Sequence, residues 1–231
     1  SLVGMLKGNR EFVLIDDQKV VYETCLAKAR IATPKKKQVV IVRGGPGTGK
    51  SVVAINLIVA LTKQGLLSKY ISKNAAPRAV YAQKLRGHRR NVEISGMFGG
   101  SGAFFDAEPD AFDALVVDEA HRLNEKSGLY ANLGENQIKE LIASAKCTIL
   151  FADDDQMVTL ADIGHSADLE SWACRMGADV TQLELASQFR CAGSDGYLAW
   201  LDDVLGIRET ANRDLDPSGY DFRVADSPVE L

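Results

Sequence analysis

A glycine-rich loop between a strand pattern and a helix pattern constrains the fold of this chain more than any other feature. Residues 44–51 read Gly-Gly-Pro-Gly-Thr-Gly-Lys-Ser and match the pattern G-x-x-x-x-G-K-[ST]. The β-branched run at residues 38–42 predicts a strand buried on both faces, and residues 50–64 predict a helix that ends at Gly65. In this context the loop turns backbone N–H groups toward one point beside a helix N-terminus, so we expect it to hold phosphate oxygens.

The side chains of this loop predict a nucleoside triphosphate bound together with Mg²⁺. Lys50 is expected to reach the β- and γ-phosphates, and Ser51 to ligate Mg²⁺ through its hydroxyl. The other phosphate contacts are expected from the body of the loop, which consists of Gly45, Pro46, Gly47, Thr48 and Gly49. The alternative is a glycine-rich structural turn, which the flanking strand and helix patterns disfavour.

A second signal is an acidic pair at the end of an apolar run. Residues 114–117 predict a strand, and Asp118 and Glu119 follow it directly. Ligands of open α/β sheets bind at the carboxyl ends of strands, where neighbouring side chains point apart. We therefore assign Asp118 to Mg²⁺ and Glu119 to activation of the attacking water. Such a pair alone is often a helix cap, so this assignment depends on the presence of the phosphate loop in the same chain.

Strand-like and helix-like segments alternate along the chain. Further strands are predicted at residues 68–72, 148–151 and 180–185, and further helices at residues 18–32 and 137–145. This alternation predicts an α/β fold, a parallel sheet with helices on both faces. Residues 91–109 are rich in Gly and Phe without a clear period, and they indicate an ordered functional loop or an insertion.

The charges of the chain are divided unevenly. Residues 24–92 contain 15 of the 27 Lys and Arg residues and no Asp or Glu, although the formal net charge is −4. A polyanion such as nucleic acid would prefer this basic region. Pairing with the acidic remainder of the chain explains the same pattern equally well, so charge alone does not choose a partner.

Cysteine spacing and hydropathy argue against several other classes of protein. The cysteines are far apart in the sequence and form no C-x-x-C pair, so reduced thiols are expected rather than a zinc site or a disulfide framework. They are Cys25, Cys147, Cys174 and Cys191. No apolar stretch approaches the roughly 20 residues of a membrane span, and no signal peptide opens the chain. We therefore expect a cytoplasmic protein without a membrane partner.

With these motifs in order, the chain resembles the superfamily 1 helicases, and most closely the Schlafen-group-3-like helicase domain. That resemblance implies a RecA-like P-loop NTPase that uses ATP and Mg²⁺. Residues 14–18 resemble the family's adenine-reading motif, with Gln18 in the key place, although Ile15 stands where the family usually has asparagine. An exposed glutamine at a helix N-terminus is the alternative interpretation of Gln18.

The resemblance also implies single-stranded DNA or RNA as a partner. Residues 72–78 are similar to the motif after the second strand, so Lys73 and Arg78 are candidates for phosphate contacts and Asn74 for a sugar or base contact. A solvated loop would look much the same. More positive charge follows at Lys84, Arg86, His88, Arg89 and Arg90. Three phenylalanines can serve as stacking faces, but core packing is the preferred interpretation of Phe98, Phe104 and Phe105.

Two later motifs complete the resemblance. Residues 151–156 are similar to the third helicase motif, which makes Gln156 the candidate γ-phosphate sensor, while at least one of the preceding acids is expected to cap the next helix. Residues 188–190 resemble the fourth motif and make Arg190 a candidate arginine finger, unless it is a surface arginine. His121 follows the acidic pair and either couples the nucleotide and nucleic-acid sites or is a satisfied structural histidine.

These observations together predict an ATP-hydrolysing helicase or translocase motor. Residues 1–190 are assigned to the first RecA-like motor domain and residues 191–231 to the start of a second, since no equivalent of the family's last two motifs follows Arg190. The alternative is a nucleotide-switched binding module of a defence or regulatory protein, which hydrolyses nucleotide without unwinding a duplex. The motifs support hydrolysis better than unwinding.

Overall fold

A computed structural model describes residues 14, 16–75, 78–79, 96–128, 130–186, 195–207 and 227. The chain divides into two compact units, Ser1–Ala186 and Ser187–Leu231. The described part of the second unit contains helix α8, Asp195–Val204. The assignment of residues 191–231 to a second RecA-like domain stays a prediction.

The first unit is built on a six-stranded sheet in the order β3-β2-β4-β5-β1-β6, and each neighbouring pair is parallel. The strands are β1 Gln38–Gly44, β2 Ser68–Ser72, β3 Phe98–Gly99, β4 Phe112–Asp118, β5 Ala145–Ala152 and β6 Asp179–Leu185. The α-helices are α2 Asp16–Ile31, α3 Lys50–Lys63, α6 Gln137–Ser144 and α7 Ser166–Arg175. The described residues of this unit also form three short 3-10 helices, η1 Ser101–Ala103, η2 Ala120–Arg122 and η3 Asp154–Gln156.

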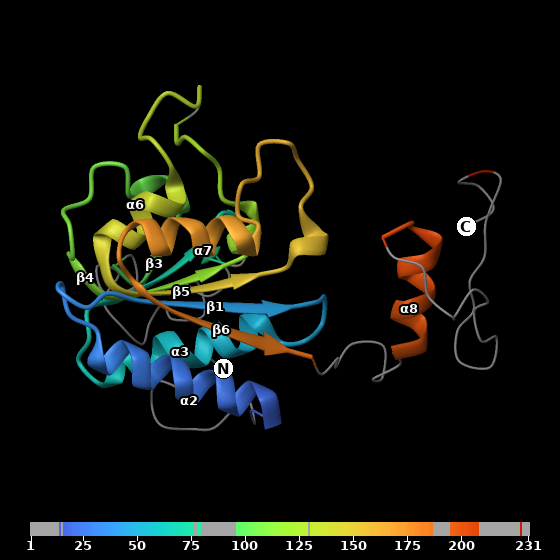
Figure 1. The fold of residues 1–231 in the computed structure, drawn as a ribbon, viewed down its shortest axis with the longest axis horizontal. Coiled ribbons are helices and arrows are strands. Elements are labelled where there is room, and N and C mark those ends of the chain that lie inside the picture. The colour runs from blue at the N-terminus through green and yellow to red at the C-terminus, as the bar shows by residue number, and fades with distance from the viewer. Residues whose placement is uncertain are drawn as a thin grey trace. The chain divides into compact units, whose positions relative to one another are not determined.

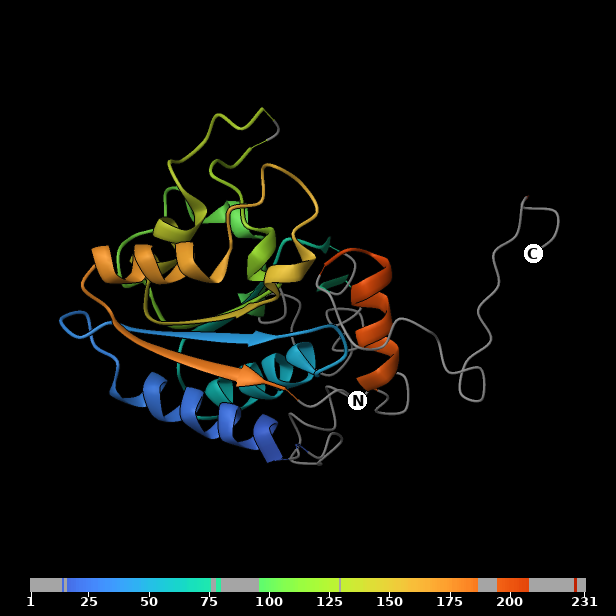
Figure 2. The same cartoon turned by 45° about the vertical axis from the view of Figure 1, so that its right-hand side comes forward.

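Helices cover both faces of this sheet, with α2 and α3 on one side and α6 and α7 on the other (Figures 1 and 2). The predicted α/β fold is therefore confirmed. The sheet places β5 between β1 and β4, so the two strands that lead into the predicted functional motifs are separated by a third. All three strands end at the same edge because they are parallel.

Strand β1 shows why a short β-branched run forms a central strand. Val40 and Val42 pack into the hydrophobic cluster under α2 and α3, while Val39 and Ile41 pack into the cluster under α6 and α7. Successive side chains of a strand point to opposite faces, so a strand with a helix layer on each side needs apolar residues at every position.

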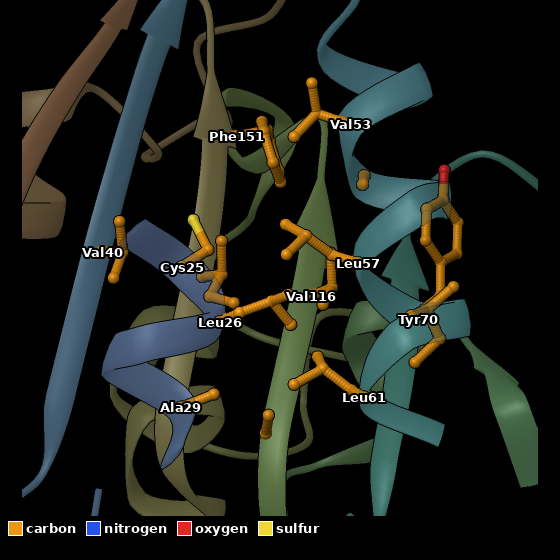
Figure 3. Close-up of a cluster of buried hydrophobic side chains, with 14 of the residues drawn as sticks. Cys25, Leu26, Ala29, Val40, Val53, Leu57, Leu61, Tyr70, Val116 and Phe151 are labelled. Atoms are coloured by element: carbon orange, nitrogen blue, oxygen red, sulfur yellow. The ribbon is translucent and has the colours of Figure 1, made fainter. Parts of the chain in front are cut away.

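Helix α3 fixes the phosphate loop to the sheet. It buries most of its residues, and Val53, Leu57 and Leu61 lie along the side that faces β4 and β5 (Figure 3). Cys25 on α2 and Cys147 on β5 are buried free thiols, and burial raises the pKa of Cys147 to about 12. Cys174 is an exposed free thiol, and Cys191 lies outside the described residues.

The described part of the Gly- and Phe-rich segment is ordered and adds an edge strand to the sheet. Strand β3 pairs with β2, and Phe98 makes an edge-to-face contact with Tyr70 at 5.8 Å between ring centroids. Phe104 is buried against Phe112. Core packing is thus confirmed for Phe98 and Phe104, whereas Phe105 is exposed. No helix in the described residues is long and apolar enough to cross a membrane.

We predict that Leu57→Ala lowers the free energy of unfolding by about 2–5 kcal/mol, because the fully buried side chain leaves a cavity between α3 and the sheet. Leu67→Ala is the matched control, since Leu67 is 60% exposed and its loss should cost no more than about 0.5 kcal/mol. Urea unfolding followed by circular dichroism measures both values. Equal losses would contradict the placement of Leu57 in the core.

Candidate nucleotide site

The phosphate loop joins β1 to α3 at the carboxyl edge of the sheet. Gly47 and Gly49 have positive φ angles, 81° and 86°, which side chains rarely allow. Thr48 Oγ1 donates a hydrogen bond to the Gly45 carbonyl at 2.9 Å and closes the loop on itself. Helix α3 has no side-chain cap and no acid in its first turn. Its first N–H groups and its dipole therefore suit an anion.

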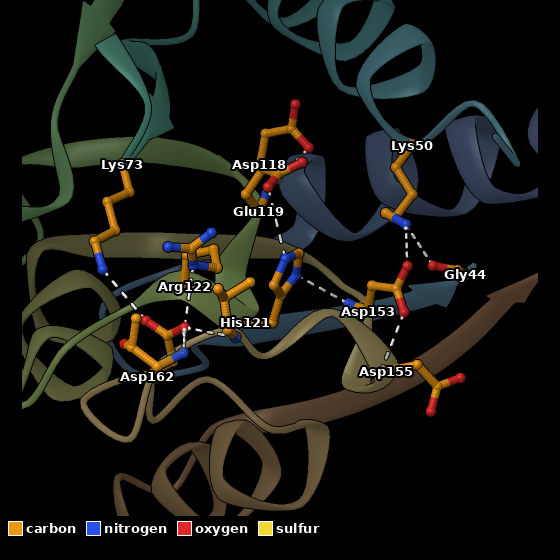
Figure 4. Close-up of polar contacts among 12 residues, drawn as sticks. Gly44, Lys50, Lys73, Asp118, Glu119, His121, Arg122, Asp153, Asp155 and Asp162 are labelled. Carbon is orange, nitrogen blue, oxygen red and sulfur yellow. Dashed lines mark hydrogen bonds and ion pairs between the residues drawn. The ribbon is translucent and has the colours of Figure 1, made fainter. Parts of the chain in front are cut away.

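Lys50 is nearly buried and its ammonium group has three acceptors. Nζ donates to the carbonyls of Gly44 and Gly45 and to Asp153 Oδ2, the last at 3.1 Å (Figure 4). An ammonium group has three protons, so these contacts use its full donor capacity. A triphosphate that engages Lys50 must replace at least one of them.

Asp153 is a site residue that sequence reasoning missed. It follows β5 directly, it is 3% exposed, and it caps η3 by accepting a hydrogen bond from the N–H of Asp155. The prediction that one of these acids caps the next helix is therefore confirmed. Its contact with Lys50 depends on β5 lying beside β1, and the sequence does not reveal that strand order.

Asp118 ends β4 with its carboxylate held on both sides. Oδ2 accepts a hydrogen bond from the Tyr70 hydroxyl at 2.7 Å, and Oδ1 accepts one from the N–H of Glu119 at 3.1 Å. Ser51 lies half-buried in the first turn of α3. A carboxylate and a hydroxyl are hard oxygen donors of the kind that Mg²⁺ takes together with phosphate oxygens and water. These two residues thus fit the predicted ion chemically.

Glu119 adopts a backbone conformation that is uncommon for a residue with a side chain. Its φ and ψ are 58° and 42°, in the left-handed region. Burial, and then the neighbouring charge of Asp118, raise the pKa of Glu119 above its ordinary value. A raised pKa moves a carboxylate toward neutrality and strengthens it as a base. Residues with a strained backbone and a shifted pKa are common at functional sites. Both features agree with the prediction that Glu119 activates the attacking water.

His121 is buried and contacts two parts of the site. Its Nδ1 accepts a hydrogen bond from the N–H of Asp153 at 3.1 Å, and its Nε2 lies 3.6 Å from Glu119 Oε2. Because Nδ1 accepts, the ring proton of the neutral form is on Nε2 and faces Glu119. Burial lowers the pKa of His121 and favours that neutral form. The histidine is satisfied structurally, and it also connects Glu119 to the end of β5.

The remaining predicted nucleotide residues have different positions. Gln18 is buried and donates a hydrogen bond to the Thr48 carbonyl at 3.0 Å. It is thus not an exposed glutamine at a helix N-terminus. Gln156 lies half-buried at the end of η3, and its N–H donates to the Asp153 carbonyl. Arg190 lies outside the described residues, so its role as an arginine finger stays a prediction.

The predicted nucleic-acid residues follow β2 at the same edge. Lys73 Nζ lies 3.3 Å from Asp162 Oδ1, and Arg122 Nε lies 3.1 Å from Asp162 Oδ2 (Figure 4). Asn74 is exposed, and Arg78 Nε donates to its carbonyl at 3.2 Å. The basic residues between 84 and 90 lie outside the described residues. Contacts with nucleic acid stay a prediction for this segment.

Asp162 is the second residue that sequence reasoning missed. Its side chain is fully buried. Burial alone would raise its pKa, but hydrogen bonds from the N–H groups of Thr159 and Val158 outweigh it and lower the pKa to about 2. The carboxylate is therefore ionised at neutral pH and holds Lys73 and Arg122 together.

Comparison with known proteins identifies one family model. Residues 37–231 match the Schlafen group 3 DNA/RNA helicase domain. Among solved structures, the chain is similar to the crystal structure of a DNA replication initiation factor, with 15% sequence identity and a TM-score of 0.42. The match covers 90% of this chain and 56% of that chain. It is similar to AMPPCP-bound DnaA from Aquifex aeolicus with 16% identity, 90% and 57% coverage, and a TM-score of 0.38. The chain thus spans little more than half the length of either structure. No curated protein matches it.

We predict that Asp153→Asn tightens the binding of Mg²⁺-ATP roughly tenfold, because the variant breaks no ion pair on binding and places no carboxylate beside the phosphates. The amide that replaces the carboxylate keeps an oxygen that can cap η3. Asp155→Asn is the matched control, since it removes the same charge from an exposed neighbour. Isothermal titration calorimetry measures both affinities. Weaker binding by Asp153→Asn would show that Asp153 itself holds the nucleotide or its metal.

We also predict a stability difference that depends on pH. The folded pKa of Asp162 is about 2 against an ordinary value of 3.8, so its ionisation stabilises the fold by about 2 kcal/mol above about pH 4. That contribution is lost as the pH falls through about 2. The difference in unfolding free energy between wild type and Asp162→Asn should therefore shrink between about pH 4 and about pH 2 in urea titrations. Asp106→Asn, at an exposed site, should show no such change.

Proposed function

The chain belongs to the Schlafen group 3 DNA/RNA helicase domain family, and on that premise we propose that it is a Mg²⁺-dependent ATPase that forms the first RecA-like motor domain of a superfamily 1-type helicase or translocase. The observation that carries the proposal is the meeting of Lys50, Asp118 and Glu119 at one edge of the sheet (Figure 4). These residues follow β1 and β4, and Asp153 at the end of β5 lies between them in the strand order. They supply the parts that phosphoryl transfer requires.

In this proposal the triphosphate binds to the loop and to the N-terminus of α3. The N–H groups of the loop hold phosphate oxygens, and Lys50 turns from Asp153 to the β- and γ-phosphates. Asp153 thereby loses the cation that balances its buried charge. Binding of nucleotide therefore disturbs the end of β5 as well as the loop.

Hydrolysis is assigned to the acidic pair after β4. Ser51 and Asp118 would hold Mg²⁺, and the ion would neutralise charge on the phosphate oxygens. Glu119 accepts a proton from the water that attacks the γ-phosphorus. The bond between the γ-phosphorus and the bridging oxygen breaks, and ADP departs with that oxygen. His121 orients the Glu119 carboxylate through its Nε2–H group.

Three further assignments belong to the same proposal. Gln156 is the γ-phosphate sensor, and its support is its place three residues after Asp153. Arg190 is the arginine finger. Residues 1–190 form the first motor domain, and residues 191–231 form the start of the second. Lys73, Asn74 and Arg78 contact single-stranded DNA or RNA, since they follow β2 at the edge where the nucleotide site lies.

The test is phosphate release from Mg²⁺-ATP with and without single-stranded DNA and RNA. Lys50→Ala should abolish binding or turnover, and Lys63→Ala, at an exposed site on the same helix, should retain both. Glu119→Gln should still bind Mg²⁺-ATP but hydrolyse it roughly 10²–10⁴ times more slowly, as expected for loss of a general base. Glu108→Gln makes the same Glu-to-Gln change at an exposed site and is the control that should retain turnover.

The outcomes separate the possible functions. Near-native turnover in Lys50→Ala would contradict the nucleotide site. Hydrolysis that depends on Lys50 and Glu119 but responds to neither DNA nor RNA, with no binding of single strands, would favour a nucleotide-switched binding module. Stimulation by single strands, lost on substitution of Lys73 or Arg78, would support the motor.

A further inference from the structure

We propose that Gln18 serves nucleotide binding by holding the phosphate loop in shape, and that it does not read the adenine base. The inference rests on the proposed nucleotide site and assigns a positioning residue to it. Its basis is one contact between the first turn of α2 and the loop, residues that lie thirty positions apart in the sequence.

The contact is directional. Gln18 Nε2 donates a hydrogen bond to the Thr48 carbonyl oxygen at 3.0 Å. A carbonyl oxygen can only accept, so the nitrogen of the amide group must face it. The residue is 5% exposed, and this bond takes one of the two protons of its amide nitrogen. A glutamine that recognises a base turns its amide group to the ligand, so the contact with the Thr48 carbonyl competes with that role.

The same amide lies very close to Gly49, the residue after Thr48. A Cβ atom built on Gly49 would lie 2.3 Å from Gln18 Nε2, which is too close for any pair of non-bonded atoms. Gly49 also has a φ of +86°, and it caps α3. The loop and the side chain of Gln18 are therefore in close contact, with the glycine allowing both the turn and the approach.

Peptide geometry carries the effect of this contact to the phosphate side of the loop. In a planar trans peptide the C=O of one residue and the N–H of the next point in opposite directions. Because Gln18 holds the Thr48 carbonyl toward α2, it also directs the N–H of Gly49 away from α2. The N–H groups of such a loop are the groups that contact phosphates. Gln18 thus controls the orientation of a phosphate-binding amide without touching the ligand.

Asp17 fixes the position of Gln18. Its Oδ1 accepts a hydrogen bond from the N–H of Gln18 at 2.9 Å, and its Oδ2 accepts one from the N–H of Ala186 at 3.0 Å. Ala186 follows β6, whose last residue, Leu185, pairs with Gly44 at the start of the loop. The first turn of α2 is therefore tied to the sheet edge from which the loop departs.

The two roles of Gln18 predict different losses. A base-reading residue contributes to the affinity for ATP and nothing to the affinity for ligands without adenine. A residue that shapes the loop contributes equally to every ligand that carries the triphosphate. The discriminating ligands are ATP, inosine triphosphate, which lacks the 6-amino group, and inorganic tripolyphosphate, which lacks base and sugar.

The test is Gln18→Met, which keeps a side chain of similar length and removes the donor. Titration of the wild type and the variant with each ligand in the presence of Mg²⁺ should give roughly tenfold weaker binding of all three, because the Thr48 carbonyl loses its partner. The ratio of the affinities for ATP and inosine triphosphate should not change. Lys19→Ala, at the exposed neighbouring position, should leave all three affinities unchanged.

A second variant protects the test against a folding defect. Gln18→Leu keeps much of the buried volume and adds no buried charge, so it should weaken the three ligands as much as Gln18→Met does, with a thermal midpoint of unfolding close to that of the wild type. A loss confined to ATP, or no loss at all in correctly folded variants, would overturn the inference. Failure of the wild type to bind any of the three ligands would overturn the proposed nucleotide site itself, and this inference with it.

Discussion

A buried ion pair between Lys50 and Asp153 determines the state of the whole carboxyl edge. Both groups are withdrawn from water, and an unpaired charge there would be costly, so each requires the other or a replacement. The pair connects the loop after β1 to the end of β5 across adjacent strands. In the proposed function a triphosphate would replace Asp153 as the anion that Lys50 contacts, so nucleotide binding would break this pair.

From this pair a line of contacts continues to the proposed general base. Asp153 donates its N–H to His121, and the other nitrogen of His121 faces Glu119. Glu119 is held in a left-handed backbone conformation beside Asp118. A change at Lys50 therefore has a physical route to the carboxylate that would activate water. That route consists of short polar contacts between neighbouring strand ends and needs no large movement of the fold.

A second buried carboxylate organises the proposed nucleic-acid side of the edge. Asp162 joins Lys73, which follows β2, to Arg122, which follows β4. Its own segment follows η3 and therefore β5. Three strand ends are thus tied together at one anion, and the side chain of Lys73 remains 34% exposed. The pKa of Asp162 keeps this connection charged at neutral pH.

The sequence by itself determined the local elements and the chemistry they deliver. The β-branched run before the loop predicted β1, the pattern G-x-x-x-x-G-K-[ST] predicted the loop and α3, and the apolar run before Asp118 predicted β4. Each of these features depends on residues that are close together in the sequence, so periodicity and spacing reveal it. Strand β3 was not predicted, since two residues are too few to show a period. Helix α7 was also not predicted, although Leu169, Trp172 and Ala173 follow helical spacing.

The partners of the functional residues were decided only by the tertiary structure. Lys50 meets Asp153, Asp118 meets Tyr70, and Gln18 meets Thr48, and none of these pairs is close in the sequence. They meet because β5 lies beside β1, because β2 lies beside β4, and because the first turn of α2 contacts the loop. Strand order arises from how helices and sheet bury their apolar faces together, a property of the whole chain that no local pattern contains.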